Sequence, residues 1–447
     1  MAAMLELLIA SFFILTLLLI IFERTHKTLA AMLGAGLSLL VAITPGSASN
    51  GDALIPDVEH LIELIEIDLI LVIIGITLMV GVARTTGIFD YITIVLLKKS
   101  GDNQYKLLIA FSLLTMLFSA FLDAYMAILL MGSITIVGCD ALDINPKPFI
   151  LAEAIFSNLG GTMTRIASPP NLIIGGHFDI DFMTFLLLTA PFVLISAVFT
   201  VLIWGFLFRK DLSREISRLT YNEVLLIDEK AVIQDPKGFR IAIVVMTLTI
   251  IAFAITSFLP FKLELGYVAM AGGFLMVGLV SSDVEKSLEK VEWPVVFFLI
   301  GLLVIVGIAE RAHLLDLLIL PVEALFEIDL FFGVLSLQWI SAAASSALDN
   351  VPVASVMTVI MDSLLEHYPK LSFPSLLVSV VIGTNLGGNI TPIGSASSVQ
   401  AITILKRSDN LEARTTFIEF VKFGTIVTLI HLIIGTFYIS LLWILII

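Results

Sequence analysis

Cysteine, paired histidines and charge are scarce in this sequence of 447 residues, and each scarcity excludes a class of protein. Cys139 is the single cysteine, which excludes an intrachain disulfide framework and a metal site built from several thiolates. The 6 histidines are scattered, without a pair at the helical spacing of metal ligands or a serine partner for catalysis. Without a P-loop or a basic tail, neither nucleotide hydrolysis nor a nucleic-acid partner is indicated. We therefore expect no enzyme activity and no resident cofactor.

Charged residues make up only 14% of the chain, whereas about 25% is usual for a soluble domain. Hydrophobic residues make up 59%, and the mean hydropathy is +1.08. Runs such as 5–22 and 417–447 are long enough to cross roughly 30 Å of hydrocarbon. The sequence predicts an all-α polytopic membrane protein.

The chain also contains an internal duplication. Residues 66–91 align with residues 292–317 without a gap, and the motif "NLGG" occurs at 158–161 and again at 385–388. The aligned pairs are Glu66 with Glu292, Gly75 with Gly301, Gly81 with Gly307, Ala83 with Ala309, Asp90 with Asp316 and Asp123 with Asp349. A register that keeps acids and glycines together indicates two repeats. We place them at 1–208 and 239–447, joined by a polar linker at 209–238.

Each repeat has a long apolar segment with an acid in its middle, at 106–139 and 329–363. It could cross the membrane once, or it could form a re-entrant hairpin. The hairpin alternative places nearly all of the 24 Lys and Arg on one side; the exceptions are Lys262, Arg311 and Lys370, with Arg165 inside the membrane. Each half then crosses five times and the repeats are inverted. We expect the termini outside and the linker in the cytoplasm, in a plasma or inner membrane.

Both "NLGG" segments break an apolar helix and are rich in oxygen ligands. Unwound backbone within a membrane persists only where it lines a cavity or binds something. The first break offers Asn158, Gly160, Thr162, Thr164, Ser168 and Asn171, and the second offers Asn385, Gly387, Asn389, Thr391, Ser395, Ser397 and Ser398. Such oxygens suit Na⁺, while half-helix termini suit ions of either sign. Inverted repeats with broken helices are the plan of a secondary transporter.

Four ionisable residues at membrane depth are candidates for ion or proton binding. Asp123 and Asp349 would bind cations or protons, or would only cap short helices. Arg165 would clamp an anion, would act as a movable internal counter-ion, or would form a salt bridge with Asp123 or Glu153. Glu153 would be a further proton-binding site, or it would be the salt-bridge partner of Arg165.

The segments 153–175 ("EAIFSNLGGTMTRIASPPNLIIG"), 345–361 and 383–399 resemble the ion transporter superfamily, and in particular the ArsB/NhaD branch that includes the melanosomal P protein. The resemblance implies a homodimer with a scaffold and a transport domain, two hairpins and elevator-type movement. It also implies ion sites at Asp123, Asn158, Gly160, Thr162 and Thr164, and at Asp349, Asn350, Asn385, Asn389 and Thr391, with bound Na⁺ at Asp123, Asn158, Asp349 and Asn385.

Two departures distinguish this chain from its close relatives. The first hairpin tip reads Asp123-Ala124 where an Asp-Asn pair is usual, and residues 167–171 read "ASPPN" where P-protein-like members read "GDPPN". Both changes make the first site less favourable to a cation. The leading hypothesis is a Na⁺/H⁺-coupled secondary transporter, with cation/proton antiport slightly favoured. The alternatives are coupled transport of an anion, arsenite or a small carboxylate, and an ion channel, which the paired hairpins argue against.

Overall fold

The computed structural model describes residues 2–22, 25–48, 51–100, 103–213, 216, 221–222, 225–226, 228–281, 283–407 and 413–446. Parts of the linker expected at 209–238 therefore lie outside the described residues. Within these ranges the structure contains helices and no strand, which confirms the all-α prediction. In the same ranges, 8 helices are long and apolar enough to cross a membrane by length and composition. The chain is an integral membrane protein.

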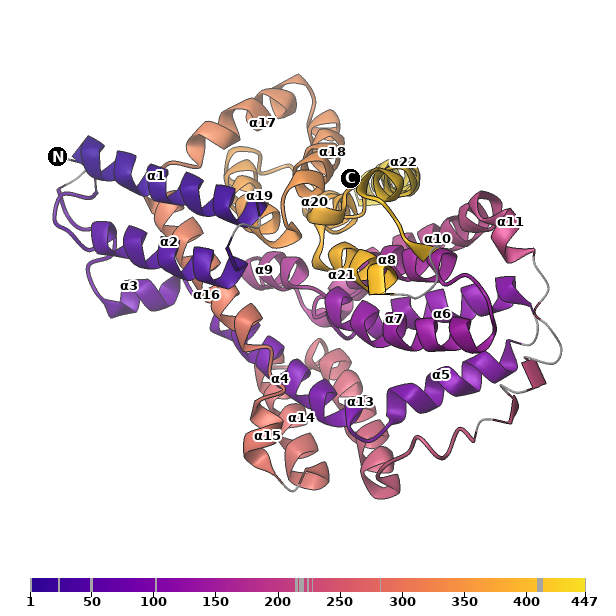
Figure 1. Cartoon of the computed structure of the whole chain (residues 1–447). Helices are drawn as coiled ribbons and strands as arrows, with labels where there is room; N and C mark the ends of the chain where they lie inside the picture. Colours follow the sequence, from indigo (N-terminus) through magenta and orange to yellow (C-terminus); the bar gives the residue numbers. More distant parts are fainter. Residues whose placement is uncertain are drawn as a thin grey trace.

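The helices of the two halves follow the same order along the chain (Figure 1). The first half comprises α1 (Ala2–Ile21), α2 (Lys27–Ala42), α3 (Val58–Glu63), α4 (Ile67–Arg84), α5 (Ile88–Lys99), α6 (Gln104–Ser119), α7 (Ala124–Ala141), α8 (Lys147–Gly161), α9 (Pro169–His177), α10 (Phe182–Leu207) and the short α11 (Arg209–Leu212). The second comprises α13 (Pro236–Thr256), α14 (Leu265–Val280), α15 (Val284–Leu288), α16 (Trp293–Arg311), α17 (Asp316–Ile328), α18 (Leu330–Ala347), α19 (Asn350–His367), α20 (Phe373–Gly387), η1 (Pro392–Gly394), α21 (Ala396–Arg407) and α22 (Phe417–Ile446).

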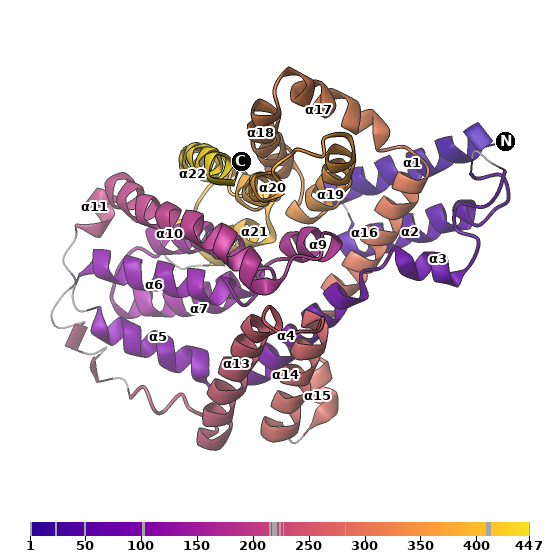
Figure 2. The ribbon, with the colours of Figure 1, turned by 180° about the vertical axis from the view of Figure 1, so that it is seen from behind.

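Helices α2, α4, α14 and α16, here called the crossed layer, join the halves. Helix α2 packs on α16 and α4 packs on α14, and each pair lies side by side from the front and from behind (Figure 2). A Cβ atom on Gly75 would lie 2.2 Å from the carbonyl carbon of Ala269, and one on Gly301 would lie 2.7 Å from that of Ala31. Glycine at both positions therefore permits backbones to approach closely.

Helices α4 and α16, which the duplication makes equivalent, run in opposite directions. Gly81 near the end of α4 lies beside Lys290, just before α16 begins, since an added Cβ would be 2.6 Å from that side chain. Gly307 near the end of α16 lies beside Leu64, just before α4 begins, at 2.7 Å by the same measure. Each helix therefore starts where its counterpart ends.

The remaining central helices, α6–α9 and α18–α21, are here called the hairpin unit. Helices α6 and α7 both pack on α8, and α18 and α19 both pack on α20. Thr164 donates a hydrogen bond to the Ala120 carbonyl at 2.6 Å, and its counterpart Thr391 donates one to Ser346 at 2.6 Å. The turn between each helix pair is thus bonded to the break that follows it, in the same way in both halves.

Candidate functional site

A cavity of about 580 Å³ lies between the hairpin unit and the crossed layer. Asp123 and Asp349 line it from the turns α6–α7 and α18–α19, and Asn158 and Asn385 line it from the ends of α8 and α20. The sequence thus predicted four residues that the structure brings to one cavity. It lies at the beginning of α16, the end at which the basic residue Lys290 is found.

The two aspartates have equivalent positions and share one role. Asp123 precedes α7 and its Oδ1 accepts a hydrogen bond from the backbone N–H of Tyr125 at 2.8 Å. Asp349 precedes α19 and its Oδ1 accepts one from Val351 at 3.1 Å. Each aspartate therefore caps a helix, as one alternative expected. Because a cap uses one oxygen, the second oxygen of each carboxylate is left for another partner.

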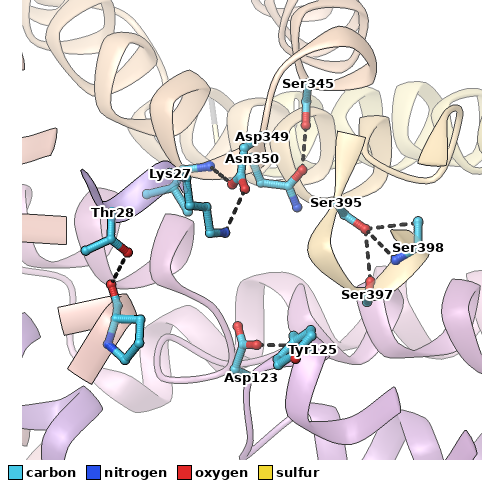
Figure 3. Close-up of polar contacts among 12 residues, drawn as sticks. Lys27, Thr28, Asp123, Tyr125, Ser345, Asp349, Asn350, Ser395, Ser397 and Ser398 are labelled. Carbon is cyan, nitrogen blue, oxygen red and sulfur yellow. Dashed lines mark hydrogen bonds and ion pairs between the residues drawn. The ribbon is translucent and has the colours of Figure 1, made fainter. Parts of the chain in front are cut away.

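Those second oxygens have different surroundings. Asp349 Oδ2 lies 3.1 Å from the ammonium of Lys27, the first residue of α2, and Figure 3 shows the two side chains pointing toward each other. Asp123 lines the same cavity from a different hairpin (Figure 3). Glu292, just before α16, also lines the cavity and interacts electrostatically with Asp123. The two hairpin turns therefore carry equivalent aspartates, but the charged groups around Asp123 and Asp349 differ.

The two broken helices are joined by hydrogen bonds that cross between the halves. Asn158 donates to Asn389 at 2.8 Å and to Ser395 at 3.0 Å, and accepts from Ser397 at 3.0 Å. In the reciprocal contact, Ser168 donates to Asn385 Oδ1 at 3.0 Å.

Asn385 in turn donates to Asn171 at 2.8 Å. The Asn171 amide also donates to the carbonyls of Gly161 and Thr164, each at 2.8 Å. Asn158, Ser168, Asn385 and Ser395 reach the cavity lining, so an ion there would meet side chains already fixed by partners.

Of the other residues expected at the site, Gly160, Gly387 and Thr162 do not line the cavity, whereas Asn350 does. Gly160 and Gly387 let α8 and α20 approach their hairpins, since an added Cβ would lie 2.2 Å from the Met116 carbonyl and 2.4 Å from that of Ala342. Thr162 donates to the Asn158 carbonyl at 2.9 Å. Asn350 does line the cavity, and its amide nitrogen, in the orientation that suits its neighbours, donates to Ser345 at 2.8 Å and to the Gly394 carbonyl at 2.7 Å.

Arg165 faces a different cavity, of about 390 Å³, at the other end of α16. Its Nη2 lies 3.5 Å from Asp68 at the start of α4, and its Nη1 donates to the Ile180 carbonyl at 2.8 Å. The alternative of a salt bridge is therefore correct in kind, with Asp68 as the partner instead of Asp123 or Glu153. A second ion pair, Lys262 with Asp179 at 2.8 Å, lines the same cavity, and this hydrogen bond raises the pKa of the Lys262 ammonium.

Glu153 lies on α8 and lines neither cavity. Its side chain is fully buried and accepts a hydrogen bond from the hydroxyl of Thr135 on α7. Its second carboxylate oxygen has no protein partner. Glu153 therefore belongs to neither cavity and is not the partner of Arg165.

Lys27 and Glu292 are two charged cavity residues that the sequence did not single out as site residues. Glu292 had a signal, because it aligns with Glu66 in the duplication. Lys27 had none beyond its place at the start of an apolar helix. Among the described residues no group of three His, Cys, Asp or Glu could hold a metal ion. The cavity lining offers carboxylate, amide and hydroxyl oxygens together.

A helical membrane protein with a polar cavity at two broken helices has the architecture of a membrane transporter. A family model described as citrate transporter (CitMHS) matches residues 17–372. The chain belongs to this citrate transporter family, within the ion transporter superfamily that the sequence motifs predicted.

Individual relatives agree with this assignment. A 46 kDa membrane protein of Mycobacterium leprae is 30% identical over 96% of this chain and 97% of its own length. The human P protein is 28% identical over 94% of this chain and 58% of its own length, which confirms the resemblance to that group. The crystal structure of the YdaH transporter of Alcanivorax borkumensis has a TM-score of 0.60 at 12% identity, covering 94% of this chain and 98% of that one. It therefore shares the fold.

Proposed function

We propose that this protein is a secondary active transporter in which Na⁺ or H⁺ binds at the 580 Å³ cavity, with cation/proton antiport as the favoured mode. The observation that carries the proposal is that Asp123 and Asp349 occupy equivalent hairpin turns and line one cavity with Asn158 and Asn385. Carboxylates at membrane depth are costly, so their presence in a cavity favours a role in ion binding. Acids also outnumber bases in the lining, which includes Asp123, Glu289, Glu292 and Asp349 against Lys27 and Lys290.

Inverted repeats at 1–208 and 239–447 are part of the proposal. The antiparallel course of α4 and α16 supports it, because equivalent helices of inverted repeats cross the membrane in opposite directions. In this arrangement the α6–α7 and α18–α19 pairs are re-entrant hairpins entering from opposite faces. The linker at 209–238 is cytoplasmic, the termini are outside, and the protein is a homodimer in a plasma or inner membrane.

Elevator-like alternating access follows from the division into two units. The crossed layer is held together by glycine-mediated backbone contacts between the halves, which suits a scaffold. The hairpin unit carries the site residues and the hydrogen bonds between the breaks, which suits a transport domain that moves as one body. The 580 Å³ and 390 Å³ cavities lie at opposite ends of α16 and share no lining residue, which favours alternating access over a continuous channel pore.

A small carboxylate or another anion is the second candidate substrate, and arsenite is included with it. Lys27 supplies a positive charge inside the cavity, and the matching family model is described as a citrate transporter. Helix α21 also begins at the cavity, at Ala396, so the positive end of its helix dipole favours a negative group there. We propose transport and no catalysis for either substrate class.

Transport by proteoliposomes under imposed Na⁺ and pH gradients tests the proposal. We expect Na⁺-driven proton flux in the wild type and its loss in Asp123→Asn and Asp349→Asn. Asp329→Asn is the matched control, because Asp329 caps α18 at 2.9 Å without lining the cavity. Asparagine caps as well as aspartate, so lost flux would report the charge. Absent cation-driven proton flux together with uptake of a labelled carboxylate would replace antiport by the second candidate.

A further inference from the structure

Lys27 links the crossed layer to the hairpin unit. Its backbone begins α2, which packs on α1 and α16, and its ammonium lies 5.0 Å from the centre of the Phe298 ring of α16. The same ammonium contacts Asp349 Oδ2 at 3.1 Å, at the turn of a hairpin. The ion pair therefore joins two units that would have to separate if the hairpin unit moved along the crossed layer.

The position of Lys27 is also one of the places where the halves differ. Residues 30–36 ("AAMLGAG") of α2 match residues 268–274 ("VAMAGGF") of α14, and in that register Leu265 takes the place of Lys27. The contacts of Gly301 with Ala31 and of Gly75 with Ala269 follow the same register. Asp349 is therefore paired with a lysine of the chain itself, Lys27. The second half has Leu265 at the position matching Lys27, so it provides no equivalent lysine for Asp123.

We infer that Lys27 is a built-in counter-ion that occupies Asp349 in place of the transported cation and holds the hairpin unit in this conformation. The inference rests on the proposed function, because it names the residue that governs cation access to that site. One oxygen of Asp349 caps α19 and the other takes the ammonium, so a cation that binds this carboxylate competes with Lys27 for its negative charge.

Asp123, Tyr125 and Glu292 interact electrostatically with Lys27. The same cavity is also lined by His26, Glu289 and Lys290. Asp123 and Glu292 attract the ammonium and a mobile cation alike. A cation that enters the cavity would therefore reach Asp123 first and Asp349 only on release of Lys27. Release then frees the turn of α18–α19 from α2, which couples cation binding to movement.

Cysteine labelling tests the inference without requiring a known substrate. In a Cys139→Ala background, Ala124→Cys places a thiol in the cavity beside the first hairpin turn. A membrane-impermeant maleimide is applied from the face that carries the 209–238 linker, in increasing NaCl with choline chloride as the ionic-strength control. We expect Lys27→Met to reduce the basal labelling rate about fivefold, the upper range for a partly exposed ion pair. Lys27→Arg should retain the wild-type rate.

The pair is isolated by a double-mutant cycle. In Asp349→Asn, which by itself should also slow labelling, we expect Lys27→Met to have no further effect. Sodium should slow labelling of the wild type, at a half-effective concentration about fivefold lower in Lys27→Met, because the competitor is gone.

Unchanged basal labelling in Lys27→Met, or an equal fall in Lys27→Arg, would overturn the inference whatever sodium does. If basal labelling follows the cycle while sodium has no effect on any variant, the counter-ion role stands and sodium coupling has failed. If sodium acts equally on the wild type and on Lys27→Met, the competition is disproved and the coupling survives.

Discussion

Asn158 of the first half donates a hydrogen bond to Ser395 of the second, and the reciprocal pair, Ser168 and Asn385, is hydrogen-bonded at the same 3.0 Å. Each asparagine belongs to an "NLGG" motif and each serine precedes the half-helix that restarts after a break. The duplicated motifs thus bind each other. Because the bonds join the halves, they make both breaks parts of one polar unit.

The first prediction concerns these serines. Ser168→Ala and Ser395→Ala should each lower the stability of the folded protein by about 1–3 kcal/mol, because a buried asparagine group loses its partner. Thermal unfolding followed by fluorescence-detected size exclusion measures this change. Ser133→Ala on the exposed side of α7, where the hydroxyl bonds only to Leu129 of its own helix, should leave the melting temperature unchanged. Equal melting temperatures for all three variants would contradict the proposed importance of the cross-half bonds.

The second prediction compares Glu292 with its repeat counterpart Glu66. Glu292 lines the cavity with Asp123, whereas Glu66 lines the cavity at the other end of α16, beside Arg165. Glu292→Gln should raise the sodium concentration needed to slow maleimide labelling of Ala124→Cys about fivefold, the scale of one charge acting through water at close range.

Glu66→Gln is the matched control and should leave that concentration unchanged in this conformation. A rise of this sodium concentration in both variants would mean that the two acids act through long-range electrostatics and not by contact with the cation. A rise in neither would remove Glu292 from the cation path.

The third prediction tests the close approach of helices at "NLGG". Gly160→Ala and Gly387→Ala would each place a methyl group within 2.4 Å of a carbonyl oxygen of the neighbouring hairpin helix. Overpacking of this kind should cost about 1–3 kcal/mol and lower the melting temperature. Gly36→Ala in α2 is the control, because nothing lies within 4 Å of its added Cβ, and it should be neutral or slightly stabilising. An unaffected Gly160→Ala variant would show that α6 and α8 can separate without cost.

Most of the fold follows from residue pattern, because lipid imposes strong rules on the chain. Apolar length predicts the spans, glycine and proline mark the breaks at 158–171 and 385–398, and the matching acids mark the hairpin turns. The duplication also predicts some contacts in three dimensions, since equivalent residues of the two repeats make equivalent contacts. The hydroxyls of Thr164 and Thr391 bond their hairpin turns as the repeat register predicts.

The partners of charged residues could not be predicted in this way. The sequence suggested Asp123 or Glu153 for Arg165, because these acids lie in the neighbouring segments. The actual partner, Asp68, belongs to α4 and is brought there by packing of α9 against the crossed layer. Lys27 reaches Asp349 over a separation of 322 residues. Such contacts depend on how the units dock, which neither periodicity nor the repeat register specifies.

The last prediction concerns Arg165 and Asp68. Arg165 is 5% exposed and has two partners, the Asp68 carboxylate and the Ile180 carbonyl, while Gly175 and Gly176 leave space for its side chain and for Glu66. Asp68 also accepts from the backbone N–H of Gly266 at 2.6 Å, which anchors it to the start of α14.

Arg165→Met would leave Asp68 beside Glu66 and Glu264 without its buried cation, and should cost about 3 kcal/mol. Arg311→Met is the matched control, because its partner Glu63 is largely exposed, and should cost about 1 kcal/mol or less. Melting temperatures of the two variants decide the comparison. Adding Asp68→Asn should recover stability only in the Arg165 variant, because it removes the charge left unpaired. If Arg165→Met has the same melting temperature as the wild type, the ion pair of Arg165 and Asp68 does not hold α9 against the crossed layer. Arg165 would then be available to bind an anion in the 390 Å³ cavity.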